Sequence, residues 1–263
     1  MADMNTLGWI VGFTLLGGVA GVMLAGIFLL VPEKARTRAL PLLVAFATGA
    51  LLAAALLGLL PEAIEMADGD YAGVGLSLLG GIALFFVLEK LVLWRHCHED
   101  HCETHAPEHG HHPERAPGVM LLVGDTIHNA LDGVLIAAAF LIDINLGIMT
   151  GLAVLAHEVP SEVGNFAVLL HGGMSRAQAF SWNLITALGA LIGGVVGYFA
   201  LSAMRPALPY ALGVSAASLL YVAVADLIPG LHRKVDARSS VLQVILIALG
   251  VVLVAAVERL HMH

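Results

Sequence analysis

Long apolar runs, separated by short polar breaks, cover most of the chain. Eight of them reach the length of about 20 residues that a helix needs to cross the hydrocarbon core of a bilayer. They span residues 7–31, 39–62, 73–94, 117–141, 145–170, 177–203, 209–230 and 240–259. Polarity does not alternate along these runs, which favours helices over strands. The pattern therefore predicts an all-α integral membrane protein with eight transmembrane helices.

The composition agrees with a membrane protein. Apolar residues make up 59% of the 263 residues and charged residues 12%, against about 45–50% and about 25% in an average globular chain. So few charges cannot cover the exterior of a soluble protein of this size. The formal net charge of −8 excludes a polycationic nucleic-acid-binding protein. We expect neither a cleavable signal peptide nor a separate soluble domain.

The basic residues indicate an orientation in the membrane. The breaks after the first, third, fifth and seventh runs hold most of the 12 Lys and Arg residues, namely Lys34, Arg36, Arg38, Lys90, Arg95, Arg115, Arg176, Arg233, Lys234 and Arg238. Because Lys and Arg favour the cytoplasmic side, we expect these breaks to face the cytoplasm. Both termini are then predicted to lie outside, in a cell membrane.

Two parts of the chain resemble each other. Residues 50–62 match residues 218–230, so that Pro61 and Pro229 superpose at an offset of 168 residues. Residues 79–91 match residues 248–260, where Glu89-Lys90 stands against Glu258-Arg259. Apolar runs always resemble each other to some degree, but the matched prolines and charged pairs favour a real repeat.

The copies lie five helices apart, so they would cross the membrane in opposite directions. Inverted repeats of this kind are typical of transporters with a site at the midplane. We therefore predict a 3+2+3 arrangement, in which the first three and the last three helices are inverted repeats. The predicted parts of this single transmembrane domain are 1–95, the cytoplasmic His-rich loop 96–116, the metal-binding core 117–171, and 172–263.

The fourth and fifth runs contain ionisable residues at membrane depth. Asp132, Glu158 and Glu162 would together cost about 8–10 kcal/mol if they were charged and unpaired. No Lys or Arg lies near them in either run. A bound cation is the simplest partner, although interhelical hydrogen bonds or a proton relay are alternatives.

The spacing of these residues fits a metal site. His128 and Asp132 are four residues apart on one helix face, with Asn129 beside His128, and His157 with Ser161 and Glu158 with Glu162 repeat that spacing. Pro160 is predicted to kink its helix and free a carbonyl. Imidazole combined with carboxylate suits Zn²⁺ and its neighbours in the transition series. The set could hold one metal or two, and Asp125 could orient His128, or instead be solvated or serve packing alone.

Residues 128–133, H-N-A-L-D-G, and 157–162, H-E-V-P-S-E, resemble the ZIP zinc/iron permeases, and specifically the subgroup with H-N-x-x-D-G and H-E-V-P-x-E on adjacent helices. The resemblance covers essentially the whole chain. It implies His128, Asp132 and His157 as a first metal position, and Asn129 and Glu158 as a second that Asp132 bridges. Ser161 stands where the family often has His or Glu, which puts a fourth ligand of the first position in doubt.

The resemblance also implies a function. It implies transport of a divalent metal toward the cytosol by an elevator-like movement of one helix bundle against another. Zn²⁺ is the expected substrate, and Fe²⁺, Mn²⁺ and Cd²⁺ are further candidates.

Residues 96–116 form a histidine-rich stretch. Such a composition is typical of a mobile metal-binding tract, and Cys97 and Cys102 are more suited to ligation than to a disulfide in a reducing compartment. A polar linker is the alternative. The candidate ligands in the loop are His96, His98, His101, Cys102 and His105.

Two further carboxylates are candidates at the ends of a transport path. Glu62 heads an acidic rim with Glu65, Asp68 and Asp70, which could raise the local cation concentration or be a plain solvated loop. Asp226, at the equivalent end of the repeat, is the candidate exit ligand.

Other functions are less consistent with the sequence. An intramembrane metalloprotease would need H-E-x-x-H, whereas position 161 is Ser, so we do not expect an enzyme. A selective channel and an exporter are not separated from an importer by sequence. A stripe that includes Gly189 and Gly193 could pack helices within one protomer or in a homodimer.

Overall fold

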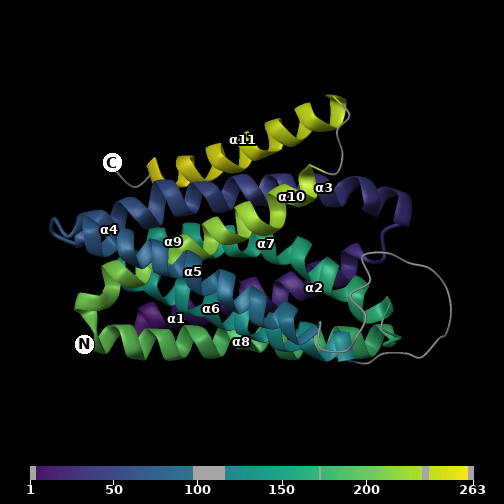
Figure 1. The fold of residues 1–263 in the computed structure, drawn as a ribbon, viewed down its shortest axis with the longest axis horizontal. Coiled ribbons are helices and arrows are strands. Elements are labelled where there is room, and N and C mark those ends of the chain that lie inside the picture. The colour runs from purple at the N-terminus through teal and green to yellow at the C-terminus, as the bar shows by residue number, and fades with distance from the viewer. Residues whose placement is uncertain (1–3, 97–115, 172, 233–236, 260–263) are drawn as a thin grey trace.

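The computed structural model describes residues 4–96, 116–171, 173–232 and 237–259, and its elements in these ranges are all helices (Figure 1). In chain order they are α1 (Met4–Leu15), η1 (Leu16–Ala20), α2 (Gly21–Phe28), α3 (Glu33–Ala53), η2 (Ala54–Leu59), α4 (Leu60–Met66), α5 (Tyr71–His96), α6 (Ala116–Ile142), α7 (Ile144–His171), α8 (Arg176–Ala203), η3 (Arg205–Ala207), α9 (Leu208–Tyr221), η4 (Val222–Leu227), α10 (Ile228–Leu231) and α11 (Ala237–Arg259). The elements η1, η2 and η4 are π-helices, and η3 is a short 3₁₀-helix.

Seven helical stretches among the described residues are long and apolar enough to cross a membrane. They are Met4–Phe28, Glu33–Met66, Tyr71–Lys90, Leu121–Ile142, Arg176–Ala203, Arg205–Leu231 and Ser239–Ala256. The fifth predicted crossing, α7, lies beside the others (Figure 1), but its polar residues lower its hydropathy. The all-helical membrane class is therefore confirmed, while the eighth crossing, the 3+2+3 order, the four predicted parts and the sidedness stay predictions.

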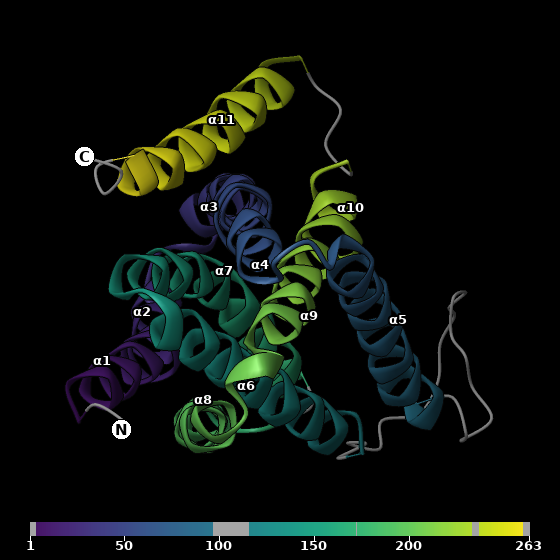
Figure 2. The ribbon, with the colours of Figure 1, turned by 90° about the vertical axis from the view of Figure 1, so that its left-hand side faces the viewer.

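Two groups of helices surround the centre (Figure 2). In one group α8 packs along α6, while α1 and α2 contact α8 and α7. In the other group α3 packs along α11 and α5 along α9. The end of α6 and the start of α7 are separated only by Asp143. The two helices pack together, and residues nearly equally far from Asp143, such as His128 and His157, lie side by side, so the helices run antiparallel.

Glycines allow the closest of these approaches. A Cβ atom at Gly193 of α8 would collide with the backbone of Ala130 on α6, and one at Gly133 of α6 would collide with the backbone of Ala190 on α8. Gly189 likewise faces the carbonyl of Thr126 on α6. The small-residue stripe is thus used inside the protomer, which is one of the two alternatives that the sequence left open.

The two outer pairs of helices cross at equivalent positions of the predicted repeat. On α3 and α11, a Cβ at Gly250 would meet the backbone of Phe46 and Ala50, beside Gly49. On α5 and α9, a Cβ at Gly81 would lie 2.6 Å from Cβ of Ala217. In the sequence match Gly81 corresponds to Gly250, and Ala217 to Gly49. The repeat therefore relates α3 to α9 and α5 to α11, and the crossing of α3 with α11 has its counterpart in the crossing of α9 with α5. An inverted repeat produces two such equivalent crossings, so they support the repeat.

The π-helices follow the same correspondence. Ala54–Leu59 and Val222–Leu227 lie 168 residues apart, and each ends two residues before Pro61 or Pro229. A proline has no N–H for the carbonyl four residues earlier and its ring clashes with that carbonyl, and a widened turn accommodates both effects. Pro160 differs from these two prolines, because α7 is α-helical from Ile144 to His171 with Pro160 inside it and no π-helix before it, and the kink expected there stays a prediction.

Asp70 connects α5 with α9 at one end of the molecule. Its Oδ1 accepts a hydrogen bond from the backbone N–H of Gly73 (2.9 Å), and its Oδ2 accepts one from the hydroxyl of Tyr210 (2.7 Å). These bonds, the Tyr210 bond first, hold the pKa of the exposed Asp70 carboxyl below its usual range. At least one carboxylate of the predicted acidic rim therefore serves the fold.

Candidate metal site

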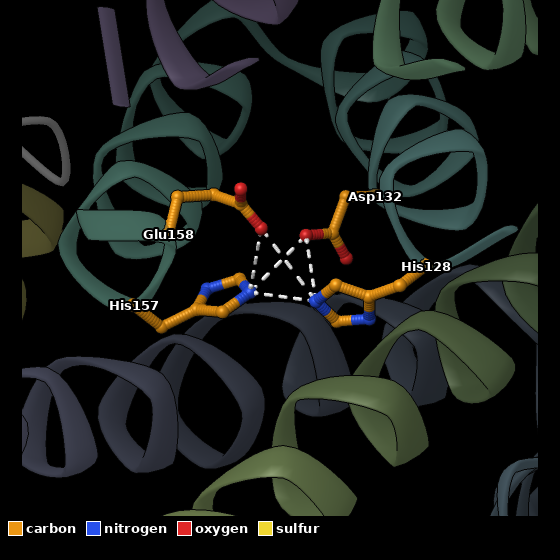
Figure 3. A group of neighbouring side chains, drawn as sticks. All are labelled: His128, Asp132, His157 and Glu158. Carbon is orange, nitrogen blue, oxygen red and sulfur yellow. Dashed lines mark hydrogen bonds and ion pairs between the residues drawn. The ribbon is translucent and has the colours of Figure 1, made fainter. Parts of the chain in front are cut away.

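Four side chains from α6 and α7 point toward one another between these two helices (Figure 3). His128 and Asp132 come from α6, where their spacing of four residues places them on one face. His157 and Glu158 come from α7. One nitrogen or oxygen atom of each side chain lies within 4.8 Å of the corresponding atom of every other.

The separations between these atoms fit a tetrahedral metal. His157 Nε2 lies 3.2 Å from His128 Nε2, 3.2 Å from Asp132 Oδ2 and 3.5 Å from Glu158 Oε1. His128 Nε2 lies 3.7 Å from Asp132 Oδ2 and 3.6 Å from Glu158 Oε1. Ligands about 2.0–2.1 Å from a tetrahedral Zn²⁺ are about 3.3–3.4 Å from one another. Five of the six separations thus lie close to this value, and the sixth, between Asp132 and Glu158, is at most 4.8 Å, so the four side chains lie close enough to bind one ion together.

Burial makes a cation the natural partner of this group. Asp132, His157 and Glu158 are each exposed by 2% or less. Both carboxylate oxygens of Asp132 and Oε1 of Glu158 accept no hydrogen bond. Among the described ion pairs, the partners of these two carboxylates are the two histidines of the same group. Because a buried charge without a partner is costly, two carboxylates with two neutral imidazoles match the charge of a divalent cation.

The orientation of His157 suits metal binding. Its Nε2 faces the other three side chains, while Nδ1 lies 3.5 Å from the carbonyl oxygen of Ala153, one turn earlier on α7. An Nδ1–H that points to a backbone carbonyl leaves the Nε2 lone pair free for a metal.

Three other predicted ligands lie outside the group of four. The side-chain amide of Asn129 donates to the backbone carbonyl of Asp125 (3.0 Å). Ser161 lines the cavity described below. Glu162 is fully buried, and neither of its carboxylate oxygens has a hydrogen-bond partner. Instead Glu158, which the resemblance assigns to a second position, lies with the three residues of the first.

Asp125 has a partner that the sequence did not single out. Asn165 on α7 donates from Nδ2 to Asp125 Oδ1 at 2.8 Å, and both residues are buried. The bond joins α6 to α7 one turn from His128. A signal was present in the sequence, since Asn165 lies four residues after Ser161 on the same polar stretch.

A cavity of about 660 Å³ leads from the site toward one end of the molecule. Its polar lining residues are Glu89, Asp125, His128, His157, Ser161, Asn165, Tyr221 and Asp226. The Tyr221 hydroxyl donates a hydrogen bond to Glu89 across the cavity wall, between α9 and α5. Asp226, the candidate exit residue, thus shares a cavity with both histidines.

Apolar side chains close the site on the side opposite the cavity. Ala153 and Met149 precede His157 on α7 by one and two turns, and they pack in one buried cluster with Leu59 and Ala139. Glu62 lies beyond this cluster and interacts electrostatically with Asp143. Since a helix rises about 1.5 Å per residue, Asp143 is about 21 Å along α7 from His157. The structure therefore does not bring Glu62 to the four-residue group.

The histidine-rich loop cannot be compared with its prediction. His98, His101, Cys102 and His105 lie outside the described residues, and His96 is the last residue of α5.

A helical membrane protein in which two histidines and two carboxylates converge between adjacent helices, three of the four fully buried, has the features of a metal permease. Comparison with known families agrees, because the model of the ZIP zinc transporters matches residues 7–118 and 94–258. The chain belongs to this family of ZIP zinc transporters. It is accordingly a divalent metal transporter and not an enzyme.

Individual relatives extend over most of the chain. The zinc transporter ZIP13 homolog of Drosophila melanogaster is 28% identical over 319 residues, which covers 95% of this chain and 90% of the relative. Zinc transporter ZIP13 of Pongo abelii is 32% identical over 226 residues, which covers 80% of this chain and 64% of the relative. Zinc transporter ZIP10 of Homo sapiens is 39% identical over 153 residues, which covers 53% of this chain and 18% of the relative.

Proposed function

We propose that the protein carries Zn²⁺ into the cytoplasm, and that His128, Asp132, His157 and Glu158 bind the ion during transport. The observation that carries the proposal is the convergence of their four ligand atoms, with separations of 3.2–3.7 Å along the five pairs given above. Two imidazoles and two carboxylates suit Zn²⁺. Fe²⁺, Mn²⁺ and Cd²⁺ accept the same ligand types, so we propose them as competing substrates.

One-sided access supports a carrier rather than a channel. The site is continuous with the cavity toward Asp226, while the buried cluster around Met149 and Ala153 separates it from Glu62. Under the orientation expected from the basic residues, the cavity faces the cytoplasm and Glu62 faces outside. In this proposal Glu62 attracts the ion on entry and Asp226 receives it on exit.

The two helix groups suit an elevator-like movement. The group α1, α2, α6, α7 and α8 contains all four proposed ligands, and its glycine contacts between α6 and α8 favour movement as one body. The group α3, α5, α9 and α11 would be the frame. Sliding the first group against the second would move the site past the apolar cluster.

A second metal position is the remaining part of the proposal. Asn129 follows His128 in sequence and Glu162 lies four residues after Glu158, and Glu162 has two buried oxygens without hydrogen bonds. We propose that they serve an additional ion with Asp132 as the bridge. A homodimer is also compatible with the family, but its interface would use a surface other than the Gly189–Gly193 stripe.

Uptake of ⁶⁵Zn²⁺ into vesicles of defined orientation tests the function. We expect saturable uptake in the direction that fills the cytoplasmic side, inhibited by Fe²⁺, Mn²⁺ and Cd²⁺ to different degrees. His157→Ala should abolish uptake, whereas the matched control His232→Ala, at an exposed histidine beyond α10, should retain it. Uptake that never saturates would indicate a channel, and transport only in the opposite direction would indicate an exporter.

A further inference from the structure

A second cavity, separate from the metal path, lies where four helices meet at the end that holds the start of α3 and the start of α8. It measures about 190 Å³ and is lined by Gly26, Leu29, Leu30, Arg36, Phe166, Leu170, Arg176 and Phe180. Six of these eight residues are apolar or glycine, and the two polar ones are both arginines. Neither arginine lies in the metal site or in its cavity.

The two guanidinium groups have little to neutralise them. Arg36 is half-buried, and its described side-chain hydrogen bond goes to the carbonyl of Leu29 at 3.5 Å. Within the described ranges no carboxylate forms an ion pair with Arg36 or Arg176, although Glu33 lies exposed three residues before Arg36. A guanidinium presents five N–H donors in a planar fork. Most of the donors of this pair are therefore available to an anion.

The surroundings specify what kind of anion fits. Phe166 and Phe180, whose ring centroids lie 6.3 Å apart, form part of the wall together with Leu170. A pocket with guanidinium groups at the mouth and aromatic and aliphatic walls suits a molecule with a phosphate at one end and hydrocarbon at the other. Basic pockets between transmembrane helices on the cytoplasmic side are sites of this kind for anionic lipids.

We propose that this cavity binds an anionic phospholipid, with the phosphate between Arg36 and Arg176 and the start of an acyl chain against Phe166 and Phe180. Arg36 belongs to α3, whereas Arg176 and both phenylalanines belong to α7 and α8. The lipid therefore connects the two helix groups. If these groups move against each other during transport, the bound lipid biases their relative position, and only this last consequence rests on the proposed function.

The experiment measures lipid binding by the purified protein in neutral detergent. Native mass spectrometry counts bound phosphatidylglycerol, with phosphatidylcholine as the neutral comparison and glycerol phosphate as a headgroup without acyl chains. Each arginine near anionic lipid contributes enough to change affinity about fivefold. Arg36→Gln and Arg176→Gln should each lower phosphatidylglycerol affinity by about that factor, and the double variant should lose the preference over phosphatidylcholine.

Two further variants separate a built site from general surface charge. Arg38→Gln removes an exposed arginine two residues from Arg36 that does not line the cavity, and it should leave binding unchanged. Gly26→Leu keeps both charges but fills the cavity next to Phe180, and it should weaken binding as strongly as the loss of an arginine. Zinc binding by each variant, measured in parallel, reports on folding.

Three results would overturn the proposal. The first is an equal effect of Arg38→Gln and Arg36→Gln, which would mean attraction by surface charge alone. The second is full retention of phosphatidylglycerol binding in the double arginine variant with zinc binding intact. The third is glycerol phosphate competing as well as the whole lipid, which would identify a site for a free phosphate group.

Discussion

His157 and Glu158 are neighbours in the chain, and their side chains leave α7 about 100° apart. Sorting residues by helix face therefore assigns them to different positions. In the structure both reach the same point, because the longer Glu158 side chain turns its Oε1 back to within 3.5 Å of His157 Nε2. Residue spacing predicts which helix turn holds a ligand. The length and conformation of each side chain then decide which ligands reach the same metal position.

This geometry makes a prediction that distinguishes two glutamates. Glu158→Gln replaces a proposed ligand and should weaken Zn²⁺ binding by more than about 100-fold, since losing even an outer partner of a ligand costs about 10–100-fold. Glu162→Gln, one turn further on the same helix and equally buried, should have a clearly smaller effect at this position. Isothermal titration of the purified variants with Zn²⁺ measures both, and equal losses would place Glu162 in the centre with the other four.

A second prediction at this scale concerns the pair formed by Asp125 and Asn165. Asn165→Ala leaves a buried carboxylate without the 2.8 Å hydrogen bond, which costs about 1–3 kcal/mol. We expect a lower thermal unfolding temperature with all four proposed ligands still present. Scanning fluorimetry with and without Zn²⁺ provides the measurement. If instead Zn²⁺ binding is lost while stability is unchanged, Asn165 acts on the metal and not on the fold.

At the scale of elements, the apolar runs predict where helices lie but not how they are wound. The run predicted at 39–62 is a single stretch of helix from Glu33 to Met66, because the charged first turn and Pro41 are accommodated inside α3. The helices accommodate their prolines in different ways. Pro160 lies in a continuous α-helix, whereas Pro61 and Pro229 follow π-helices. A proline signals a carbonyl without its donor, and packing decides how the backbone responds.

The crossing of α6 and α8 allows an element-scale prediction with a matched control. Gly193→Ala places a methyl group against the backbone of Ala130, and overpacking of this kind costs about 1–3 kcal/mol. Gly12→Ala makes the same chemical change on α1, where no atom lies within 4 Å of the new Cβ, and should be neutral or slightly stabilising. Thermal stability in a neutral detergent compares the two. Equal behaviour would mean that the two helices separate readily at this crossing.

At the scale of the whole molecule, the important property is that the site opens in one direction. Ser161 and Ala153 lie one turn after and one turn before His157 on α7, yet Ser161 lines the large cavity and Ala153 is fully buried. Composition and motifs predicted the membrane class, the family and the helices that carry the site. They could not predict this asymmetry, since it arises from packing between α7 and residues far away in sequence, such as Leu59.

Thiol labelling measures the asymmetry. In a background where Cys97 and Cys102 are replaced by serine, Ser161→Cys should react with a small hydrophilic thiol reagent at least about tenfold faster than Ala153→Cys, because reactivity follows exposure. Zn²⁺ should slow the labelling of Ser161→Cys. Comparable rates at both positions would describe a site open to both sides, as in a channel.

The histidine-rich loop gives the last prediction at this scale. Deleting residues 97–114 removes none of the four proposed ligands and leaves every described helix whole, so basal Zn²⁺ uptake should persist with altered apparent affinity or regulation. Uptake by proteoliposomes and membrane insertion are measured together. Normal insertion with complete loss of uptake would make the loop part of the transport path.

The π-helix at Val222–Leu227 has a consequence for the register of its own helix. A π-turn holds one residue more than an α-turn, so everything after it is rotated by about 100° relative to a regular continuation. Asp226 lies inside this turn and is exposed on the cavity wall, while α9, which precedes the turn, packs against α5. The matching turn before Pro61 carries Gly58 at the position that corresponds to Asp226. The two halves thus share a rotated turn, but only the later half uses it to display a carboxylate.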